Sequence, residues 1–265
     1  MTTEIALSVE NLTVKFGGVT ACDSIGFDVK RGELFAVIGP NGAGKTTLIN
    51  ALTGIYEPVK GASAKFHHTN GTTYDLLSYA RPHEIARLGM ARTFQNLGVF
   101  NEQTVLSNLM LGRYNHETPG IFSCGFFSSK AINSELKSRE AVESILSLFE
   151  LEDYRNELVG GLPYGVQKRV ELGRVLAMEP ELLLLDEPMA GMTAEEKQDM
   201  VRFVYRLMEQ TGVTILLIEH DMGVVMAISE RVLALEFGRS IALGTPGEVQ
   251  SDPEVIRAYL GTETH

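Results

Sequence analysis

Short apolar runs mark the predicted strands of this chain. Near the amino end, strands are expected at 6–9, 24–29 and 34–38, with Arg31-Gly32 as the turn before the third. Two later runs, at 182–185 and 213–218, are continuously apolar, which is typical of strands buried on both faces of a parallel sheet. Two further strand-like runs, both short, follow toward the carboxyl end at 232–237 and 240–242.

Helical segments alternate with these runs, at about 45–52, 167–178 and 194–210. Because strands and helices alternate along the chain, the pattern predicts an α/β fold with a mainly parallel sheet, preceded by antiparallel strands at the amino end. Between residues 96 and 162 the pattern is mostly helical, and 134–151 is its clearest amphipathic segment. The chain therefore resembles a core with a helical insertion.

We expect the following division into domains. Residues 1–95 and 163–265 form the core, and residues 96–162 form an inserted helical subdomain. Within the core, residues 231–265 carry the last strands and a helical tail around 253–260.

Composition narrows the class of protein. Hydrophobic residues make up 44% and charged residues 22% of the 265 residues, as in ordinary globular proteins, and no repeat period is visible. The longest stretch without an acidic or basic residue, 118–129, is shorter than the ~20 apolar residues that span a bilayer. Residues 1–10 do not resemble a secretory signal, so we expect a cytoplasmic protein.

Charge and cysteine content restrict the partners. The net charge of −11 opposes non-specific binding to nucleic acid or anionic lipid, so any attachment to a membrane is expected to go through protein. The two cysteines, Cys22 and Cys124, lack metal-ligand spacing, and free thiols in a reducing compartment are expected.

A phosphate-binding motif follows the third strand. Residues 39–46 match the P-loop pattern between a predicted strand and a predicted helix, a context that a chance glycine-rich turn would not have. Its backbone N–H groups and the N-terminus of the following helix are suited to bind a phosphate chain. Lys45 is expected to contact the β and γ phosphates, and the Thr46 hydroxyl is expected to bind Mg²⁺. The expected nucleotide-binding residues here are Gly39, Pro40, Asn41, Gly42, Ala43, Gly44, Lys45, Thr46 and Thr47.

Two carboxylates end the apolar run at 182–185. Asp186 and Glu187 would lie at the carboxyl edge of a parallel sheet, where ligands bind. Asp186 is suited to bind the metal ion, and Glu187 is suited to activate a water molecule. Alone, the pair would be better explained as an exposed acidic turn after a core strand, but the P-loop in the same chain favours the functional interpretation.

The order of these and later motifs resembles that of ABC ATPases. Gln95 follows the P-loop, residues 162–167 (Leu-Pro-Tyr-Gly-Val-Gln) precede Asp186-Glu187, and His220 follows a strand. A single Gln usually lies at the surface, a single His is usually structural, and a residue such as Phe16 usually belongs to the core, so the order and spacing carry the resemblance. A P-loop kinase or GTPase would not explain this order.

The resemblance implies roles for individual residues. Phe16 would stack on adenine, and Gln95 would contact Mg²⁺ and the attacking water while linking the core to the helical insertion. Glu187 would be the general base, and His220 would hold the γ-phosphate and the base in register. Gly165, in the signature segment 162–167, would meet the γ-phosphate on a second subunit, so that two chains form two composite sites.

Other residues narrow the resemblance to the branched-chain amino-acid importer ATPases. They are found at 91–96, Tyr164, 218–222, 244–246 and 252–256. Urea and short-amide importers share much of this pattern and remain an alternative. A non-transport ABC ATPase of DNA repair or the ribosome is a further alternative, but a single cassette, the lack of a long heptad run and the negative charge disfavour it.

The implied cofactors are ATP and Mg²⁺. The implied partners are membrane permease subunits, an extracytoplasmic solute-binding protein that acts indirectly, and a second ATP-binding subunit; no nucleic acid is expected. A heterodimer is favoured, and a homodimer is possible. The chain would lie at the inner face of the cell membrane through the permease subunits. The segment 119–129 is a candidate for docking onto them, with a self-packed loop as the alternative.

The signature departs from the general family pattern. Pro163, Tyr164 and Val166 replace the usual Ser, Gly and Gln, and Thr193 stands where the family often has Asp. Pro163 offers neither a hydroxyl nor a backbone N–H, so donors to the partner's nucleotide are reduced. We hypothesise that the site using this signature is the weaker one of a heterodimer.

Overall fold

The computed structural model describes residues 4–79, 81–93, 97–115 and 129–260. The chain divides into two compact units. The sheet unit contains Met1–Arg92, Glu181–Ala190 and Met208–His265, and the helical unit contains Thr93–Pro180 and Gly191–Leu207.

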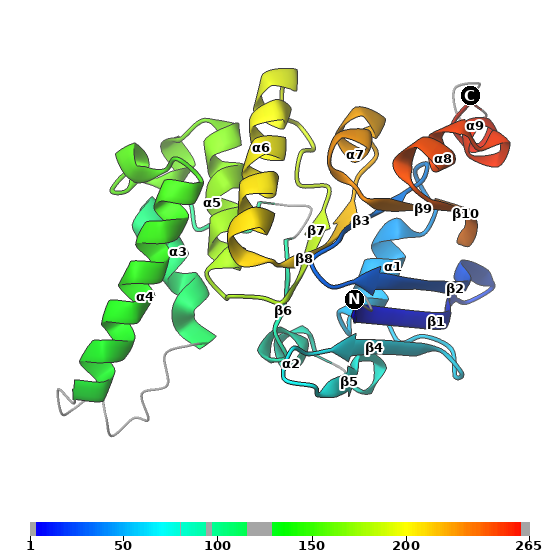
Figure 1. The fold of residues 1–265 in the computed structure, drawn as a ribbon, viewed down its shortest axis with the longest axis horizontal. Coiled ribbons are helices and arrows are strands. Elements are labelled where there is room, and N and C mark those ends of the chain that lie inside the picture. Colours follow the sequence, from blue (N-terminus) through cyan, green and yellow to red (C-terminus); the bar gives the residue numbers. More distant parts are fainter. Residues whose placement is uncertain (1–3, 80, 94–96, 116–128, 261–265) are drawn as a thin grey trace. The chain divides into compact units, whose positions relative to one another are not determined.

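The larger sheet of the sheet unit contains β3 (Leu34–Ile38), β6 (Met90–Arg92), β7 (Leu182–Asp186), β8 (Thr214–Ile218), β9 (Arg231–Glu236) and β10 (Arg239–Gly244). Its order is β10-β9-β3-β8-β7-β6, and only the β9–β10 pair is antiparallel (Figure 1). Every residue of β3, β7 and β8 is buried, which explains why their sequences are apolar without alternation.

The second sheet is antiparallel and contains β1 (Ile5–Phe16), β2 (Val19–Lys30), β4 (Ser63–His67) and β5 (Thr73–Asp75). Its order is β2-β1-β4-β5. Burial alternates along the second half of β2, so one face of the hairpin formed by β1 and β2 packs inward. The antiparallel strands predicted at the amino end are confirmed, and both are longer than the sequence pattern indicates.

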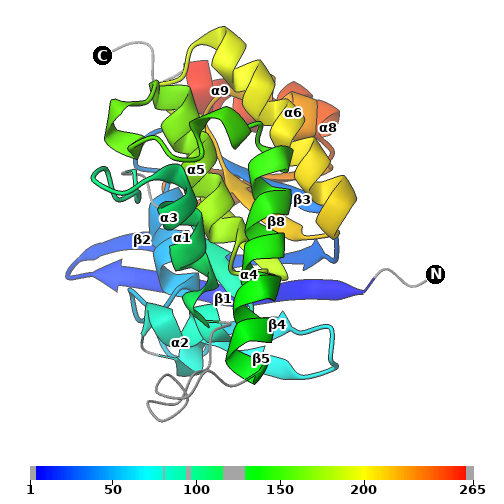
Figure 2. The same cartoon turned by 90° about the vertical axis from the view of Figure 1, so that its left-hand side faces the viewer.

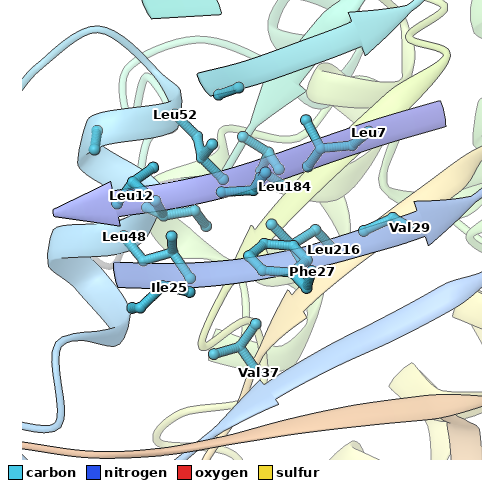
Figure 3. Close-up of a cluster of buried hydrophobic side chains, with 14 of the residues drawn as sticks. Leu7, Leu12, Ile25, Phe27, Val29, Val37, Leu48, Leu52, Leu184 and Leu216 are labelled. Atoms are coloured by element: carbon cyan, nitrogen blue, oxygen red, sulfur yellow. The ribbon is translucent and has the colours of Figure 1, made fainter. Parts of the chain in front are cut away.

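Both sheets and helix α1 (Lys45–Leu52) contribute to one hydrophobic core (Figure 3). Phe27 of β2 and Phe35 of β3 stack with ring centroids 5.2 Å apart, and Leu48 of α1 is fully buried in the same core. Burial of a Leu or Phe side chain contributes about 1.5–3 kcal/mol. The core therefore anchors the helix that follows the P-loop to both sheets.

Short helices complete the sheet unit. They are η1 (Leu76–Ser78), α2 (Pro82–Arg87), α7 (Met222–Ile228), α8 (Pro246–Ser251) and α9 (Pro253–Leu260). The Asp221 side chain caps α7 by accepting the N–H groups of Gly223 and Val224. Thr245 and Glu248 form a capping box at the start of α8.

The helical unit contains α3 (Val105–Gly112), η2 (Arg113–Asn115), α4 (Ser129–Leu148), η3 (Glu152–Tyr154), η4 (Val159–Gly161), α5 (Tyr164–Leu176) and most of α6 (Ala194–Thr211). The larger helices can be followed in green and yellow in Figure 2. Phe149 and Phe203 pack in its core with ring centroids 5.8 Å apart. The buried Arg113 guanidinium donates to the Ala177 carbonyl at 2.9 Å, which joins α3 to the end of α5.

The predicted α/β fold class is confirmed, whereas some element limits differ. Helix α5 begins at Tyr164, three residues before the predicted start at 167, because Pro163 already serves as its N-cap. The helical unit includes α5, whereas the expected subdomain ends at 162; that domain division stays a prediction. None of the helices in the described ranges is long and apolar enough to cross a bilayer.

Candidate functional site

The P-loop connects β3 to α1 and surrounds the amino group of Lys45. Lys45 is the first residue of α1, and its side chain is buried. Its Nζ donates to the carbonyl oxygens of Gly39 at 2.6 Å and Pro40 at 3.1 Å. Burial lowers the pKa of Lys45, and the nearby carboxylates of Glu187 and Asp186 oppose this effect. The loop thus holds a cation that an entering phosphate can pair with.

Close backbone contacts fix the shape of the loop. Gly44 caps α1 with a φ of 102°, and a Cβ atom there would lie 2.5 Å from the Ala21 carbonyl oxygen. Only glycine fits this position. Ala43 donates its N–H to the Pro40 carbonyl at 3.1 Å and accepts the Gly238 N–H at 3.0 Å. The loop is therefore pinned between β2 and the turn that follows β9, while Asn41, Gly42 and Thr46 are exposed.

Asp186 ends β7 and is paired with Arg92 of β6. The Arg92 guanidinium donates from Nη2 to Asp186 Oδ2 at 2.8 Å. Its Nη1 donates to Asn50 Oδ1 at 2.7 Å and to Thr53 Oγ1 at 3.1 Å. Arg92 therefore joins two strands to the α1 region. Sequence reasoning did not assign Arg92 to the site, although it lies in the motif at 91–96.

Glu187 and His220 come together at the carboxyl ends of β7 and β8. Glu187 has a φ of 48°, and its N–H donates to the Ile218 carbonyl at 2.9 Å. The distance from His220 Nδ1 to Glu187 Oε2 is 3.7 Å. The His220 side chain is half exposed, so both groups can reach a ligand at this edge of the sheet. The two residues expected to be the base and its orienting group thus lie close together, and their roles stay predictions.

Glu219 is a buried residue that sequence reasoning did not single out. Its carboxylate accepts the N–H groups of Met189 and His220, each at 3.1 Å. Burial raises the pKa of Glu219, and these two N–H groups counteract the increase. Glu219 thereby joins the backbones that follow β7 and β8 and holds Glu187 and His220 in place.

The donors expected for Mg²⁺ are hard oxygen ligands, as that ion requires. Thr46 offers a hydroxyl at the exposed start of α1, and Asp186 offers a carboxylate at the end of β7. Within the part of the chain that the structure describes, no cluster of three or more His, Cys, Asp or Glu side chains could hold a metal ion. A magnesium ion here would take further ligands from phosphates and water, which is its usual mode of binding. Gln95, the third expected ligand, lies outside the described residues.

Phe16 lies at the end of β1, and its side chain is 45% exposed. Its ring meets Tyr56 edge-on, with centroids 4.9 Å apart at 79°. The hairpin that carries Phe16 borders the P-loop, because β2 passes Gly44 at Ala21 and Cys22. The exposed ring is therefore available to stack on a flat ligand beside the loop.

The carboxyl-terminal helix α9 also reaches the P-loop. The hydroxyl oxygen of Tyr259 is buried, and the Gly39 backbone of the P-loop is close enough to influence its pKa. Burial raises the pKa of Tyr259, and the Gly39 backbone N–H partly offsets this increase. Tyr259 did not stand out in the sequence, because a single tyrosine in a helical tail usually belongs to the core.

Gly165, another predicted ligand residue, lies in the helical unit as the second residue of α5. Its N–H donates to the carboxylate of Glu196. Pro163 caps the helix with its backbone alone, and its carbonyl accepts the N–H groups of Val166 and Gln167, each at 3.0 Å. The docking candidate at 119–129 and Cys124 fall in the range whose side chains the structure does not describe, whereas Cys22 is a buried free thiol.

Two family models match the chain. A model described as "ABC transporter" matches residues 22–190, more than half of the chain. A second, described as "Branched-chain amino acid ATP-binding cassette transporter", matches residues 239–265, the segment that contains Tyr259. The resemblance inferred from the motif order is confirmed.

Relatives match over nearly the full length. The chain is 38% identical over 256 residues to the high-affinity branched-chain amino acid transport ATP-binding protein BraF of Pseudomonas aeruginosa, and 36% identical over 256 residues to LivG of Escherichia coli. Each alignment covers 96% of this chain and 97% of the relative.

Solved structures agree with these similarities. An ATP-binding cassette of an ABC transporter in its ADP conformation has a TM-score of 0.81 at 31% identity, over 98% of this chain and 100% of that one. A nucleotide-free cassette has a TM-score of 0.79 at 31% identity, over 96% of this chain and 98% of that one.

Proposed function

The chain belongs to the family of ABC transporter ATP-binding proteins, and from this membership we propose that it powers an importer of branched-chain or other hydrophobic amino acids. As a member of the family it is an ATP-binding protein and an ATPase. The observation that carries the proposed mechanism is the buried ammonium group of Lys45 within the P-loop, close to the carboxylates of Asp186 and Glu187. The proposed solute follows the names of the relatives.

Binding of ATP would use the P-loop and its surroundings. Lys45 would exchange its contacts with Gly39 and Pro40 for the β and γ phosphates, to which the α1 N-terminus also presents its positive end. Phe16 would stack on the adenine ring. Thr46 and Asp186 would hold Mg²⁺, which when bound neutralises charge on the phosphates.

Hydrolysis would take place at the ends of β7 and β8. Glu187 would accept a proton from the water that attacks the γ-phosphorus, while the bond to the bridging oxygen of ADP breaks. His220, whose Nδ1 lies 3.7 Å from Glu187 Oε2, would keep that carboxylate oriented and contact the γ-phosphate. Gln95 would help to position the water. Catalysis would consist mainly of positioning and charge stabilisation.

The working assembly would contain two ATP-binding subunits on membrane permease subunits. Gly165 of one subunit would face the γ-phosphate bound to the other, so neither subunit would hold a complete site. The second subunit is proposed to be a different chain, and an extracytoplasmic solute-binding protein would deliver the amino acid. The chain would then lie at the inner face of the cell membrane through its permease partners.

Uptake measurements in the source organism test which solute the transporter carries. Replacing the chain by its Glu187→Gln variant is expected to reduce uptake of radiolabelled leucine, isoleucine and valine to background and to leave urea uptake unchanged. Loss of urea uptake with normal amino-acid uptake would reject the proposed solute and favour the short-amide alternative. Normal uptake of both would reject a transport role for these solutes.

A further inference from the structure

Glu196 joins the amino ends of two helices in the helical unit. It lies in the first turn of α6, where its Oε2 accepts the Thr193 N–H at 2.9 Å and its own N–H donates to Thr193 Oγ1 at 3.3 Å. These contacts form the reciprocal cap of α6. The same carboxylate also accepts the N–H of Gly165 in the first turn of α5.

The contact with Gly165 is close. A Cβ atom built on Gly165 would lie 2.6 Å from Glu196 Oε1 and 3.1 Å from Cδ, so a larger residue here would require the carboxylate to move. The contacts with Thr193 suffice to cap α6, and they do not account for the additional approach to α5. The carboxylate of Glu196 therefore lies at the starts of both α5 and α6.

We propose that Glu196 is an internal anion that occupies the α5 N-terminus in the resting subunit and has to leave Gly165 before the γ-phosphate of a second subunit can bind there. This inference rests on the proposed function, in which Gly165 meets that phosphate. A carboxylate and a phosphate favour the same place, because both are stabilised by the exposed N–H groups and positive end of a helix. They cannot share one N–H, so Glu196 competes with the nucleotide.

The surroundings of Glu196 suit such a movement. Hydrogen bonds from the Thr193 backbone and side chain and from Gly165 lower the pKa of Glu196, so the side chain is an anion at neutral pH. A hollow of about 80 Å³ adjoins the contact and is lined in part by Gly165, Arg169 and Glu196. This space lies beside the carboxylate of Glu196, and its lining contains both the guanidinium of Arg169 and the carboxylate of Asp199.

The test compares Glu196→Gln with Glu195→Gln in the complete transporter in lipid vesicles. Both substitutions remove one negative charge from the first turn of α6, and Glu196→Gln keeps an oxygen that can still cap Thr193. The MgATP concentration at half-maximal hydrolysis is expected to fall roughly two- to fivefold in Glu196→Gln, as for a charge at a helix N-terminus, and to stay unchanged in Glu195→Gln. An unchanged or higher concentration in Glu196→Gln, or an equal fall in both variants, would overturn the proposal.

A second measurement examines the contact itself. In the isolated nucleotide-free chain, the Gly165 amide proton resonance is expected to move upfield in Glu196→Gln, because a hydrogen bond to a neutral oxygen is weaker. An unmoved resonance would also overturn the proposal. Failure of the proposed function is recognised separately: hydrolysis in a Lys45→Ala complex at the wild-type rate would reject it. Hydrolysis that depends on Lys45 but not on Glu196 would reject only the role of Glu196.

Discussion

The backbone of Glu187 has a φ angle of 48°, which few residues other than glycine adopt. The conformation is held by the Glu187 N–H, which donates to the Ile218 carbonyl, rather than by the side chain. An amide at this position therefore preserves the local structure but cannot accept the proton of the attacking water. We expect Glu187→Gln to bind ATP as tightly as the wild type and to hydrolyse it about 10²–10⁴ times more slowly.

Binding of a fluorescent ATP analogue and release of inorganic phosphate measure the two effects of Glu187→Gln separately. Glu181→Gln, which changes a carboxylate at the opposite end of β7, is the matched control and should hydrolyse ATP normally. Wild-type turnover in Glu187→Gln would remove Glu187 from the role of base.

Lys45 is the other residue whose environment points to a single role. Its ammonium group is buried against two carbonyl oxygens, and no phosphate contact remains once the side chain ends at Cβ. Loss of a hydrogen bond to a charged group costs about 1.5–3 kcal/mol, so Lys45→Ala should weaken ATP binding by roughly tenfold to 150-fold.

Titration calorimetry with ATP measures the affinity of the Lys45 variant. Lys60→Ala, which removes an exposed lysine of the same unit, should leave that affinity unchanged. Equal affinities of Lys45→Ala and Lys60→Ala would show that the P-loop lysine does not contact the nucleotide.

At the scale of elements, α5 begins at Tyr164 behind Pro163, which supplies no side-chain cap. Serine at the N-cap can accept a backbone N–H and donate its hydroxyl, so Pro163→Ser should stabilise the helix by about 0.5–2 kcal/mol and strengthen ATP-dependent pairing of subunits. Aspartate caps a helix equally well but carries a negative charge. Pro163→Asp should therefore also stabilise the helix, yet weaken pairing.

Thermal unfolding and the MgATP dependence of pairing separate the two effects of the Pro163 variants. Equal pairing in the wild type, Pro163→Ser and Pro163→Asp would contradict a phosphate at this helix N-terminus. It would leave Pro163 as a variation without consequence for the composite site.

The elements differ in how far their sequences predict them. Helices α1 and α9 begin and end where expected, because Gly44 and Pro253 mark their starts and apolar periodicity continues through each. Strand β6 was missed, since three residues carry no detectable period. The P-loop was predicted from its own pattern, Glu187 from its place after an apolar run and His220 from the motif order. Arg92 and Tyr259, by contrast, reach the site through contacts between segments far apart in the chain. A single sequence contains no signal for such pairs.

For the whole molecule, the expected partnership has a measurable consequence. The net charge of −11 opposes self-association of the free chain, and Gly165 is proposed to act only on nucleotide held by another subunit. The purified chain should therefore be largely monomeric without ATP and should hydrolyse ATP slowly until it is joined to its permease and second subunit.

The Glu187→Gln variant, which should bind ATP without hydrolysing it, is expected to form stable dimers in MgATP. It should pair with itself if the working dimer is a homodimer, and only with the second subunit if the working dimer is a heterodimer. Light scattering after size-exclusion chromatography distinguishes these cases, and Lys45→Ala, which should not pair, is the control. Full activity of the isolated wild-type monomer at low protein concentration would contradict the composite site, because one chain would then contain every catalytic group.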